Sequence, residues 1–464
     1  MKSERAYPCA VVTPKGERAI VGGHPWVYEA EVVSLSHAGD APDAVAATGL
    51  AETALTTGGS ALPLEAGPAA PASDAAPAAP APDAAPAVPA PAAAPGAAIP
   101  NGSLVDVVSR KGRYLGTGPY SQRSKIRIRL VTRNANDRFD RAFWKRKLQW
   151  AWEYRKAVMG GDASCCRVLF SEADGFPGLI VDRFDDVLVA ETLSVGMERL
   201  KPVIFPLLLE VLAEDGVSVR GLYERNDVST RALEGLEESK GWFAGDGPTS
   251  AEIVENGVRY KVDFENGQKT GFFLDQKYNR RAVARLARGK RVLDCFTHTG
   301  SFALNAALGG AEFVRAVDVS DLAIDQARAN AQLNSLEGCM DFTVANVFDF
   351  LPALERQRDE RYDFIILDPP AFTKSRRTIN KAARGYKEIN YRAMKLLPRG
   401  GYLATCSCSH FMDADRFKHV IASAAQDAGV QLRQIEERQQ APDHPIVWGV
   451  PETNYLKFFL FQVV

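Results

Sequence analysis

Two cysteines separated by a single serine, Cys406 and Cys408, stand at the end of a predicted buried strand. Side chains two residues apart in an extended chain point to the same side. A lone buried cysteine is usually an inert small hydrophobic residue. Carbon 5 of a pyrimidine, however, is a poor nucleophile, and its methylation requires a thiolate that first adds at carbon 6. Either cysteine is therefore a candidate nucleophile for pyrimidine chemistry.

A second candidate group is the carboxylate of Asp368, which follows the buried strand predicted at 362–367 and precedes Pro369 and Pro370. Two consecutive prolines favour an extended, rigid loop. Such a loop would hold the carboxylate at the edge of a sheet, where it can contact a ring nitrogen or an exocyclic amine of a base. A purely structural turn is the alternative for this tripeptide taken alone.

A predicted strand, turn and helix at 291–309 have the form of a nucleotide-binding turn, but Gly300 is the one glycine before the helix. A dinucleotide pyrophosphate needs several glycines for close backbone approach, whereas S-adenosylmethionine carries no phosphate. Asp294 is placed to hold the ammonium of that cofactor, and Asp318, after the next strand, to accept hydrogen bonds from the ribose hydroxyls. Asn346 and Val347 would flank the adenine, on their position alone. An ordinary turn with a helix-capping acid is the alternative.

These groups are positioned by a regular alternation of strands and helices that begins at Arg291. The alternation predicts a parallel, doubly wound α/β sheet, whose ligands bind beyond the carboxyl ends of the strands. The loops that follow Asp294, Asp318, Leu367 and Ala404 should therefore form the site. The predicted strands are 291–296, 313–318, 341–345, 362–367, 401–407, 432–439 and 455–463, and the predicted helices are 301–309, 320–334, 348–357, 379–397 and 413–428.

The N-terminal part of the chain predicts a small β-domain over residues 1–133, with short strands and a turn at 5–36 and further strands at 103–133. Between them, residues 37–101 become almost wholly Ala and Pro after Gly67. Such a composition cannot bury enough apolar surface to offset the entropy of ordering. We therefore expect one β-domain that is interrupted by a disordered insertion, and we expect that deleting residues 40–99 leaves activity intact.

The middle of the chain, residues 134–264, predicts a compact α+β domain. Its helices are expected at 137–160 and 198–214, and a hairpin is expected across Asn256-Gly257, which is a typical two-residue hairpin turn. Residues 265–464 complete a third domain, in keeping with two or three domains for 464 residues. The predicted strands of the middle domain are 166–171, 177–183, 187–194 and 217–224.

The net charge of −1 conceals two basic segments. Residues 37–101 hold six acidic residues and no Lys or Arg, so the rest of the chain carries +5. Segment 110–147 has 13 Lys and Arg against two acids, and segment 374–399 has nine against one. Phosphate neutralisation by such segments would give affinity for RNA, and Phe372, Tyr386 and Tyr391 could stack on bases. A solvated helix face is the alternative for each segment.

The seven cysteines are odd in number and scattered, and they lack paired C-x-x-C spacing, so neither a disulfide framework nor a metal site is favoured. A reducing, cytoplasmic compartment fits best. The N-terminus has no apolar signal core, and the longest apolar stretch, around 203–212, is far shorter than the ~20 residues that span a bilayer. We expect no membrane segment.

Taken together, these motifs make the chain resemble the bacterial ribosomal RNA large-subunit methyltransferase I family, which methylates cytosine at carbon 5. The resemblance covers the chain outside residues 37–101. It implies an N-terminal PUA RNA-binding domain, a small central α+β domain and a C-terminal class I methyltransferase domain. The residues that carry it are Gly22-Gly-His-Pro-Trp26, Ser171-Glu-Ala-Asp-Gly-Phe-Pro-Gly-Leu-Ile-Val-Asp-Arg183, Glu224-Arg-Asn-Asp227, Gln268-Lys-Thr-Gly-Phe-Phe-Leu-Asp-Gln276, Phe296-Thr-His-Thr-Gly300, Asp368-Pro-Pro370 and Thr405-Cys-Ser-Cys-Ser409.

The resemblance also implies roles for individual residues. Related RNA cytosine-5 methyltransferases carry their nucleophile in a Thr-Cys-Ser triplet, which selects Cys406 and leaves Cys408 as the alternative. Those enzymes often have a second cysteine where this chain has Pro369-Pro370, so product release needs another base, and Cys408 could assist. Residues implied in the cofactor pocket, besides those already placed there, are Phe272, Phe273, Gln276, Phe296, Thr297 and Thr299, with Asp368 facing both cofactor and base.

The expected partner is therefore large-subunit ribosomal RNA, and a homodimer is left open. Two other readings remain at this stage. An enzyme that methylates a ring nitrogen or amine of a purine would need no thiol. Alternatively, an RNA-binding assembly factor could retain a methyltransferase fold without activity, although the set of Asp294, Asp318 and Asp368 argues against it.

Overall fold

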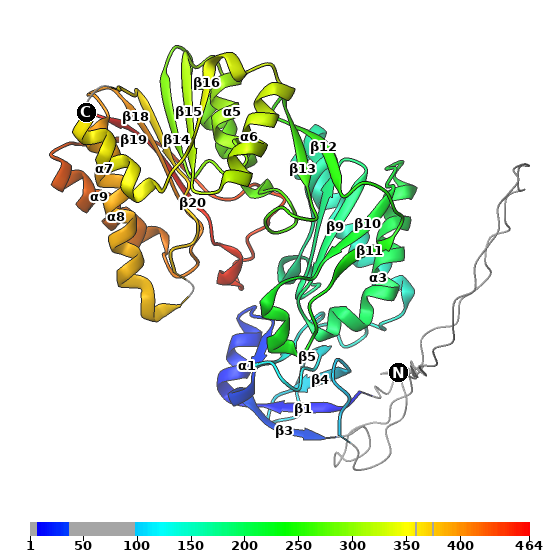
Figure 1. Cartoon of the computed structure of the whole chain (residues 1–464). Coiled ribbons are helices and arrows are strands. Elements are labelled where there is room, and N and C mark those ends of the chain that lie inside the picture. The colour runs from blue at the N-terminus through cyan, green and yellow to red at the C-terminus, as the bar shows by residue number, and fades with distance from the viewer. Residues whose placement is uncertain (1–6, 37–97, 358–359, 374) are drawn as a thin grey trace, which may run out of the picture.

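A computed structural model describes residues 7–36, 98–357, 360–373 and 375–464. Figure 1 shows the N-terminal strands at one end of the molecule, the C-terminal sheet at the other, and a five-stranded sheet between them. In this described part, every helix is too short or too polar to cross a membrane.

The N-terminal unit confirms that strands from both sides of the predicted insertion belong to one fold. Strand β1 pairs antiparallel with β3, which precedes the insertion, and parallel with β4, which follows it. The sheet has the order β3-β1-β4-β5, and β2 pairs with β6 beside it. The elements are β1 Cys9–Val12, α1 Pro14–Val21, β2 Trp26–Tyr28, η1 Glu29–Glu31, β3 Val32–Ser36, β4 Leu104–Val108, β5 Tyr114–Pro119 and β6 Ile126–Arg129.

Two details of the N-terminal prediction were wrong. Residues 5–36 contain helix α1 where only strands and a turn were expected; Thr13 caps it by accepting from the Gly16 N–H, and Pro14 occupies its first turn. The insertion also ends before residue 101, because Ile99 is only 7% exposed and packs in the core of the unit. The rest of the predicted insertion, residues 37–97, lies outside the described residues.

The central unit is a five-stranded sheet in the order β11-β10-β9-β8-β7, covered by two long helices. Both helices begin at a capping side chain: the Asp140 carboxylate accepts from the Phe143 N–H at 2.8 Å, and the Ser194 hydroxyl accepts from the Met197 N–H. Strand β11 was not predicted. The elements are α2 Arg141–Met159, η2 Gly160–Ser164, β7 Cys165–Phe170, η3 Ser171–Asp174, β8 Leu179–Phe184, β9 Val187–Thr192, α3 Val195–Glu214, β10 Gly221–Arg225, η4 Ser229–Glu234 and β11 Lys240–Ala244.

A hairpin of β12 (Ser250–Glu255) and β13 (Val258–Asp263) joins the central and C-terminal units. Its turn is the predicted Asn256-Gly257, and both residues have positive φ. The side chains of the hairpin share one hydrophobic core with both neighbouring sheets. The proposed boundary after residue 264 therefore falls at a segment that packs on both sides.

The C-terminal unit is a seven-stranded sheet in the order β16-β15-β14-β17-β18-β20-β19. The first five of these strands are parallel, as predicted, while β20 runs antiparallel between β18 and β19. Helices α4, α5 and α6 cover one face and α7, α8 and α9 the other (Figure 1). The elements are η5 Leu274–Gln276, α4 Lys277–Ala284, β14 Arg291–Cys295, α5 Ser301–Leu308, β15 Phe313–Asp318, α6 Asp321–Leu333, η6 Glu337–Cys339, β16 Met340–Val344, α7 Val347–Gln357, β17 Phe364–Leu367, η7 Arg376–Thr378, α8 Ile379–Leu396, β18 Tyr402–Ser407, α9 Ala414–Ala428, β19 Leu432–Arg438, η8 Pro451–Thr453 and β20 Lys457–Val463.

Candidate active site

The loop between β14 and α5 is a tight, strained turn. Phe296 and His298 have φ values of 63° and 53°, and Gly300 has a φ of 84°. A side chain at Gly300 would bring its Cβ to 3.0 Å from the Cβ of Ala327 on α6. Non-glycine residues in this backbone region persist only where surrounding structure enforces them, and they cluster at functional sites. The strain marks this loop as a functional one.

The carboxylate of Asp294 ends β14 and is completely buried. One of its oxygens accepts hydrogen bonds from the Thr297 hydroxyl at 2.5 Å and from the Ala303 N–H at 2.9 Å. Its other oxygen, Oδ1, has no hydrogen-bond partner among the described residues. Burial raises the pKa of Asp294 to about 7. An unpartnered buried carboxylate oxygen is ready to accept from a cationic ligand.

Asp318 ends the neighbouring strand β15, and its carboxylate faces the same loop. It accepts from the backbone N–H of His298 at 2.9 Å and from that of Ser320 at 3.1 Å. Burial lowers the pKa of His298 to about 4, so its imidazole is neutral. The first and second loops are thus locked together at the carboxyl edge of the sheet.

The residues predicted to flank an adenine lie after β16. The Asn346 side chain is exposed and accepts from the Phe348 N–H at 3.1 Å, while Val347 is 2% exposed and packs in the core. Phe348, which the sequence analysis missed, contacts the ring of Phe372, and Phe296 lies against both. Three aromatic rings therefore border this end of the site.

The segment before β14 brings its predicted residues to the same place. The Phe273 ring contacts the His298 imidazole, with ring centroids 5.2 Å apart. Phe272 is buried beneath the guanidinium of Arg280, which forms a buried ion pair with Glu255. The Arg280–Glu255 pair was missed because its two members are 25 residues apart and share no local motif.

Asp368 directly follows β17, and its carboxylate lies beside Gln276 and both candidate thiols. The Gln276 amide donates to Asp368 Oδ1 at 3.0 Å, and the Gln276 carbonyl accepts from Asn279 at 2.6 Å. Loss of surrounding water raises the pKa of Asp368 to about 7, and the nearby carboxylate of Asp275 adds to the effect. A carboxylate with a pKa near neutrality is suited to accept a proton at physiological pH.

Both candidate thiols lie beside this carboxylate, as their two-residue spacing predicts. The Cys406 thiol is completely buried beside the Asp368 carboxylate and the Gln276 side chain. Cys408 is half-buried, and its Sγ lies 4.0 Å from the carbonyl oxygen of Pro369. Burial raises the pKa of Cys406 well above its usual value and that of Cys408 to about 12. Neither thiol is ionised at neutral pH without a base, and Asp368 is the carboxylate adjacent to both.

Comparisons with known proteins identify the family of this chain. A family model described as S-adenosylmethionine-dependent methyltransferase matches residues 234–462, and one described as PUA-like domain matches residues 91–133. Ribosomal RNA large subunit methyltransferase I from Shigella dysenteriae serotype 1 is 39% identical over 78% of this chain and 90% of its own length. The same-named protein of Escherichia coli O157:H7 is 39% identical over 78% of this chain and 91% of its own. The chain belongs to the ribosomal RNA large subunit methyltransferase I family.

Solved structures confirm the fold of this family member. A protein from Streptococcus mutans, assigned as a SAM-dependent methyltransferase, superimposes with a TM-score of 0.71 at 20% identity and covers 98% of this chain and 99% of its own. A methyltransferase in complex with SAH gives a TM-score of 0.68 at 23% identity, over 78% of this chain and 92% of its own. The predicted architecture, a PUA-like unit followed by a Rossmann-like methyltransferase unit, is confirmed.

The family's cofactor, S-adenosylmethionine, fits the residues that this chain provides. Buried oxygens without a hydrogen-bond partner in the described part of the chain include Asp294 Oδ1, Thr299 Oγ1 and Asp275 Oδ1. Asp294 near the end of β14 and Thr299 in the loop that follows it lie at the carboxyl edge of the sheet, where an ammonium donor can satisfy these oxygens. The protein is therefore an S-adenosylmethionine-dependent methyltransferase, as its family shows.

The two basic segments differ in how far their charge is neutralised. In the first, carboxylates already pair with several cations, as in Arg129 with Glu234 at 2.7 Å and Lys145 with Glu210 at 2.6 Å. In the second, Lys387 and Arg392 have carboxylate partners. Among the described residues, no ion pair is formed by the cations that follow the Asp368 loop in the sequence, namely Arg376, Arg377, Lys381 and Arg384.

Proposed function

We propose that this methyltransferase acts on carbon 5 of a cytidine in large-subunit ribosomal RNA, in the cytoplasm. The observation that carries the proposal is the buried Cys406 thiol beside the Asp368 carboxylate, whose pKa burial raises to about 7, at the carboxyl edge of the methyltransferase sheet. A nitrogen or amine methyltransferase has no use for a thiol at this position. The names of the relatives support ribosomal RNA as the substrate.

The cofactor is held, in this proposal, by the loops at the carboxyl edge of β14 to β17. Asp294 and Thr299 take the ammonium end, and Asp318 takes the ribose hydroxyls. Phe273 and Gly300 shape the intervening pocket. When bound, S-adenosylmethionine supplies the methyl group. The further residues assigned to this pocket are Phe272, Gln276, Phe296, Thr297, Asn346, Val347 and Asp368, together with Phe348.

The covalent steps follow from the contacts of Cys406. Asp368 accepts the thiol proton, and the resulting thiolate adds at carbon 6 of the cytosine, which makes carbon 5 nucleophilic. Gln276 holds the Asp368 carboxylate in place through its 3.0 Å hydrogen bond. After methylation, a base takes the carbon 5 proton, the electrons of that bond restore the double bond between carbons 5 and 6, and the sulfur leaves as the Cys406 thiolate, which recovers its proton from Asp368. Cys408, close to the same loop, can act as that base once its own thiol has given its proton to solvent.

RNA binding is assigned to the PUA-like unit at residues 1–133 and to the cations that follow Asp368. The central unit at 134–264 connects them to the methyltransferase unit at 265–464. Arg376 and Arg377 lie in η7, immediately before α8 begins at Ile379, in the segment that follows the proposed catalytic loop. Their charges can contact the phosphates around the target nucleotide, and such contacts weaken as the salt concentration rises.

The test uses large-subunit ribosomal RNA that contains 5-fluorocytidine. Fluorine replaces the carbon 5 proton, so release is blocked and a covalent complex of protein and RNA should accumulate. We expect Cys408→Ala to trap the complex and Cys406→Ala to lose it. Trapping by Cys406→Ala but not by Cys408→Ala would move the nucleophile to Cys408. Methylation retained by the double variant would reject covalent catalysis, and mass spectrometry of the product would then identify a purine target.

A further inference from the structure

The side chain of Trp448 is 99% exposed. Every other exposed large apolar side chain in the described part of the molecule is at most 70% exposed. Trp448 lies in the loop at 439–456, which joins β19 to β20. A solvated indole keeps its apolar surface in water, so covering it with a ligand or partner is favourable.

Sheet topology places this loop on the catalytic side of the molecule. Strand β20 runs antiparallel to β18, and β19 runs antiparallel to β20. The loop therefore leaves the sheet at the same carboxyl edge as the loops after β14, β17 and β18. The Lys457 ammonium at its end donates to the carbonyl of Ser409 at 2.8 Å, immediately after Cys408. The loop that carries Trp448 therefore begins and ends at the edge of the sheet where the proposed active site lies.

The backbone that presents the indole is fixed by hydrogen bonds. Residues Val447 to Val450 form a β-turn, closed by the Val450 N–H donating to the Val447 carbonyl at 2.8 Å. The hydroxyl of Thr453 donates to the Val450 carbonyl at 2.7 Å and accepts from the Val447 N–H at 2.9 Å. Thr453 thus holds both ends of the turn, and Trp448 occupies one of its two corners.

The turn also rests directly on the N-terminal unit. A Cβ built on Gly449 would lie 2.7 Å from the Cα of Gly23, so neither position accommodates a side chain. Beside this contact, the His24 imidazole lies 3.2 Å from the Glu452 carboxylate. This contact accounts for the Gly-Gly-His run of the sequence, which receives the loop from the methyltransferase unit.

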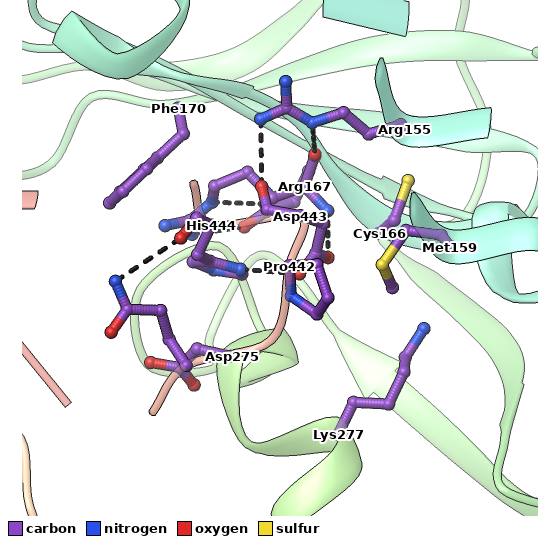
Figure 2. Close-up of polar contacts among 12 residues, drawn as sticks. Arg155, Met159, Cys166, Arg167, Phe170, Asp275, Lys277, Pro442, Asp443 and His444 are labelled. Carbon is purple, nitrogen blue, oxygen red and sulfur yellow. Dashed lines mark hydrogen bonds and ion pairs between the residues drawn. The ribbon is translucent and has the colours of Figure 1, made fainter. Parts of the chain in front are cut away.

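The start of the loop is anchored in the central unit by a buried polar cluster around Asp443 (Figure 2). The Asp443 carboxylate accepts from the backbone N–H of Arg167 at 2.9 Å and from the His444 imidazole at 2.9 Å. The Arg155 guanidinium donates to the Asp443 carbonyl at 2.9 Å. The loop is therefore held at both ends before any RNA binds.

We propose that Trp448 is a stacking platform for an unpaired RNA base next to the target nucleotide. This inference rests on the function proposed above. Aromatic rings stack on unpaired bases of any sequence, and a prefixed ring loses little entropy on binding. The cations of η7 and of the first turns of α8, Arg376, Arg377, Lys381 and Arg384, lie at the same edge of the sheet and match the charge of an RNA backbone.

Binding to single-stranded RNA tests the platform without any methylation step. Wild type and variants are titrated with fluorescein-labelled RNA of about 15 nucleotides that contains one central cytidine. Trp448→Ala should weaken binding roughly 5- to 100-fold, the range that corresponds to one stacked base, and Trp448→Phe should restore most of the affinity. Leu233→Ala, which removes another exposed apolar side chain at 68% exposure, is the matched control.

An abasic scan then locates the stacked base. Removing one base at a time from the RNA should weaken wild-type binding most at a position beside the cytidine. Trp448→Ala should bind the same abasic RNA almost as tightly as it binds the intact RNA, because the ring that stacks on that base is already absent. Equal affinity of Trp448→Ala and wild type, or additive effects at every position, would overturn the platform.

Two further results separate this inference from its foundation. Wild-type protein that binds RNA through Trp448 but leaves cytidine unmethylated would reject the proposed function and keep the platform. If wild type forms 5-methylcytidine and Trp448→Ala has the same KM for RNA as wild type, the proposed function is kept and the stacking platform is rejected. A dimer seen by sedimentation velocity that Trp448→Ala dissolves, with RNA affinity unchanged, would assign the residue to self-association and reject stacking.

Discussion

At the scale of single residues, two carboxyl groups of the site, Asp294 and Asp368, have raised pKa values and are partly protonated at neutral pH. Asp294 is completely buried with one oxygen unpartnered, and burial raises its pKa to about 7. Asp368 has a pKa of about 7 beside the Cys406 thiol. A carboxylate that is partly protonated at neutral pH can become ionised when a cation binds, or can take a proton from a thiol.

This state of Asp294 predicts the pH dependence of cofactor binding. The ammonium of the ligand favours the ionised carboxylate, so affinity for S-adenosylhomocysteine should rise as pH increases from about 6 through about 7 and then level off. Asp294→Asn should lower affinity roughly 10- to 100-fold and flatten this rise. Calorimetry across the pH range measures both, with Asp368→Asn as the control for the second acid. An unchanged slope in Asp294→Asn would show that another group controls binding.

The raised pKa of Asp294 also predicts that its carboxylate, which favours cofactor binding, lowers the stability of the ligand-free protein. The folded pKa of Asp294 is raised, so between about pH 4 and pH 7 the folded state binds more protons than the unfolded state, and stability falls as pH rises. Above pH 7 the ligand-free protein buries a charge. Asp294→Asn should therefore raise the free energy of unfolding at about pH 8 by roughly 1–3 kcal/mol. Urea unfolding without ligand at pH 5 and pH 8 tests the sign, and a variant destabilised at both would contradict it.

At the scale of elements, the loop between β19 and β20 does more than connect two strands. It starts at the Asp443 cluster in the central unit and continues to the seat on Gly23. The N–H of Ala441 also donates to the Asp275 carbonyl at 2.8 Å, one residue before Gln276. The loop therefore connects all three units to the segment that holds Asp368.

Removing the carboxylate at the start of this loop should destabilise the protein as a whole. Asp443→Ala leaves the Arg167 N–H and the His444 ring without their buried acceptor, and we expect a loss of about 3 kcal/mol in the free energy of unfolding. Burial opposes ionisation of Asp443, but the charge and hydrogen bond of the His444 imidazole, with help from Lys277 and the Arg167 N–H, lower its pKa. Its contribution is therefore present above about pH 4 and is lost below that as the carboxylate is protonated. Urea unfolding at pH 7 and pH 3.5 should give a smaller difference at the lower pH, and an equal one would place the effect elsewhere.

The close contact between Gly449 of this loop and Gly23 of the N-terminal unit gives a separate prediction. Gly449→Ala places a Cβ 2.7 Å from the Gly23 Cα, which forces two backbones apart and should cost roughly 1–3 kcal/mol. Gly338→Ala is the matched control, because a Cβ there meets nothing within 4 Å. Thermal unfolding compares the two variants. The same stability for both would mean that the N-terminal unit does not support the loop.

Elements with a strong local pattern were predictable, and contacts between distant segments were not. The helices and strands from Arg291 onward lie within about two residues of their predicted bounds, because burial of alternate or 3.6-spaced residues shows in the sequence itself. Helix α1 was missed since it is only eight residues long and contains a proline and a glycine. The direction of β20 and the exposure of Trp448 depend on pairing across the chain, which no local window contains.

The same distinction holds for the site. The three acids and two cysteines were predicted because each ends a strand of a doubly wound sheet, where topology brings strand ends together. Arg280, Phe348 and Thr453 were missed. Their roles come from partners on other elements, such as Glu255 for Arg280 and the Val447 turn for Thr453. The Gly-Gly-His run was noticed as part of a family pattern, but its physical reason needed the position of Gly449.

At the scale of the whole molecule, the strands that precede and follow residues 37–97 in the sequence belong to one sheet. Strands β3 and β4 both flank β1, so the residues Ser36 and Asp106, which pair with Cys9 from opposite sides, are about 10 Å apart. A few residues can bridge that distance. The entropic cost of a longer loop grows only logarithmically with its length, so a shortened loop should leave the sheet intact or slightly more stable.

We therefore predict that a deletion of residues 40–97 folds and methylates like wild type. The deletion stops at 97 because Ile99 is buried in the core, and a longer deletion of 40–99 should lower the free energy of unfolding by roughly 1–3 kcal/mol through loss of that side chain. Thermal unfolding and the yield of methylated ribosomal RNA compare the two deletions with wild type. The shorter deletion also removes six acidic residues, which raises the net charge from −1 to +5, so its RNA affinity should increase at low salt and return toward wild type at high salt. A folded deletion of 40–97 with much less activity at both salt concentrations would show that the segment takes part in the reaction.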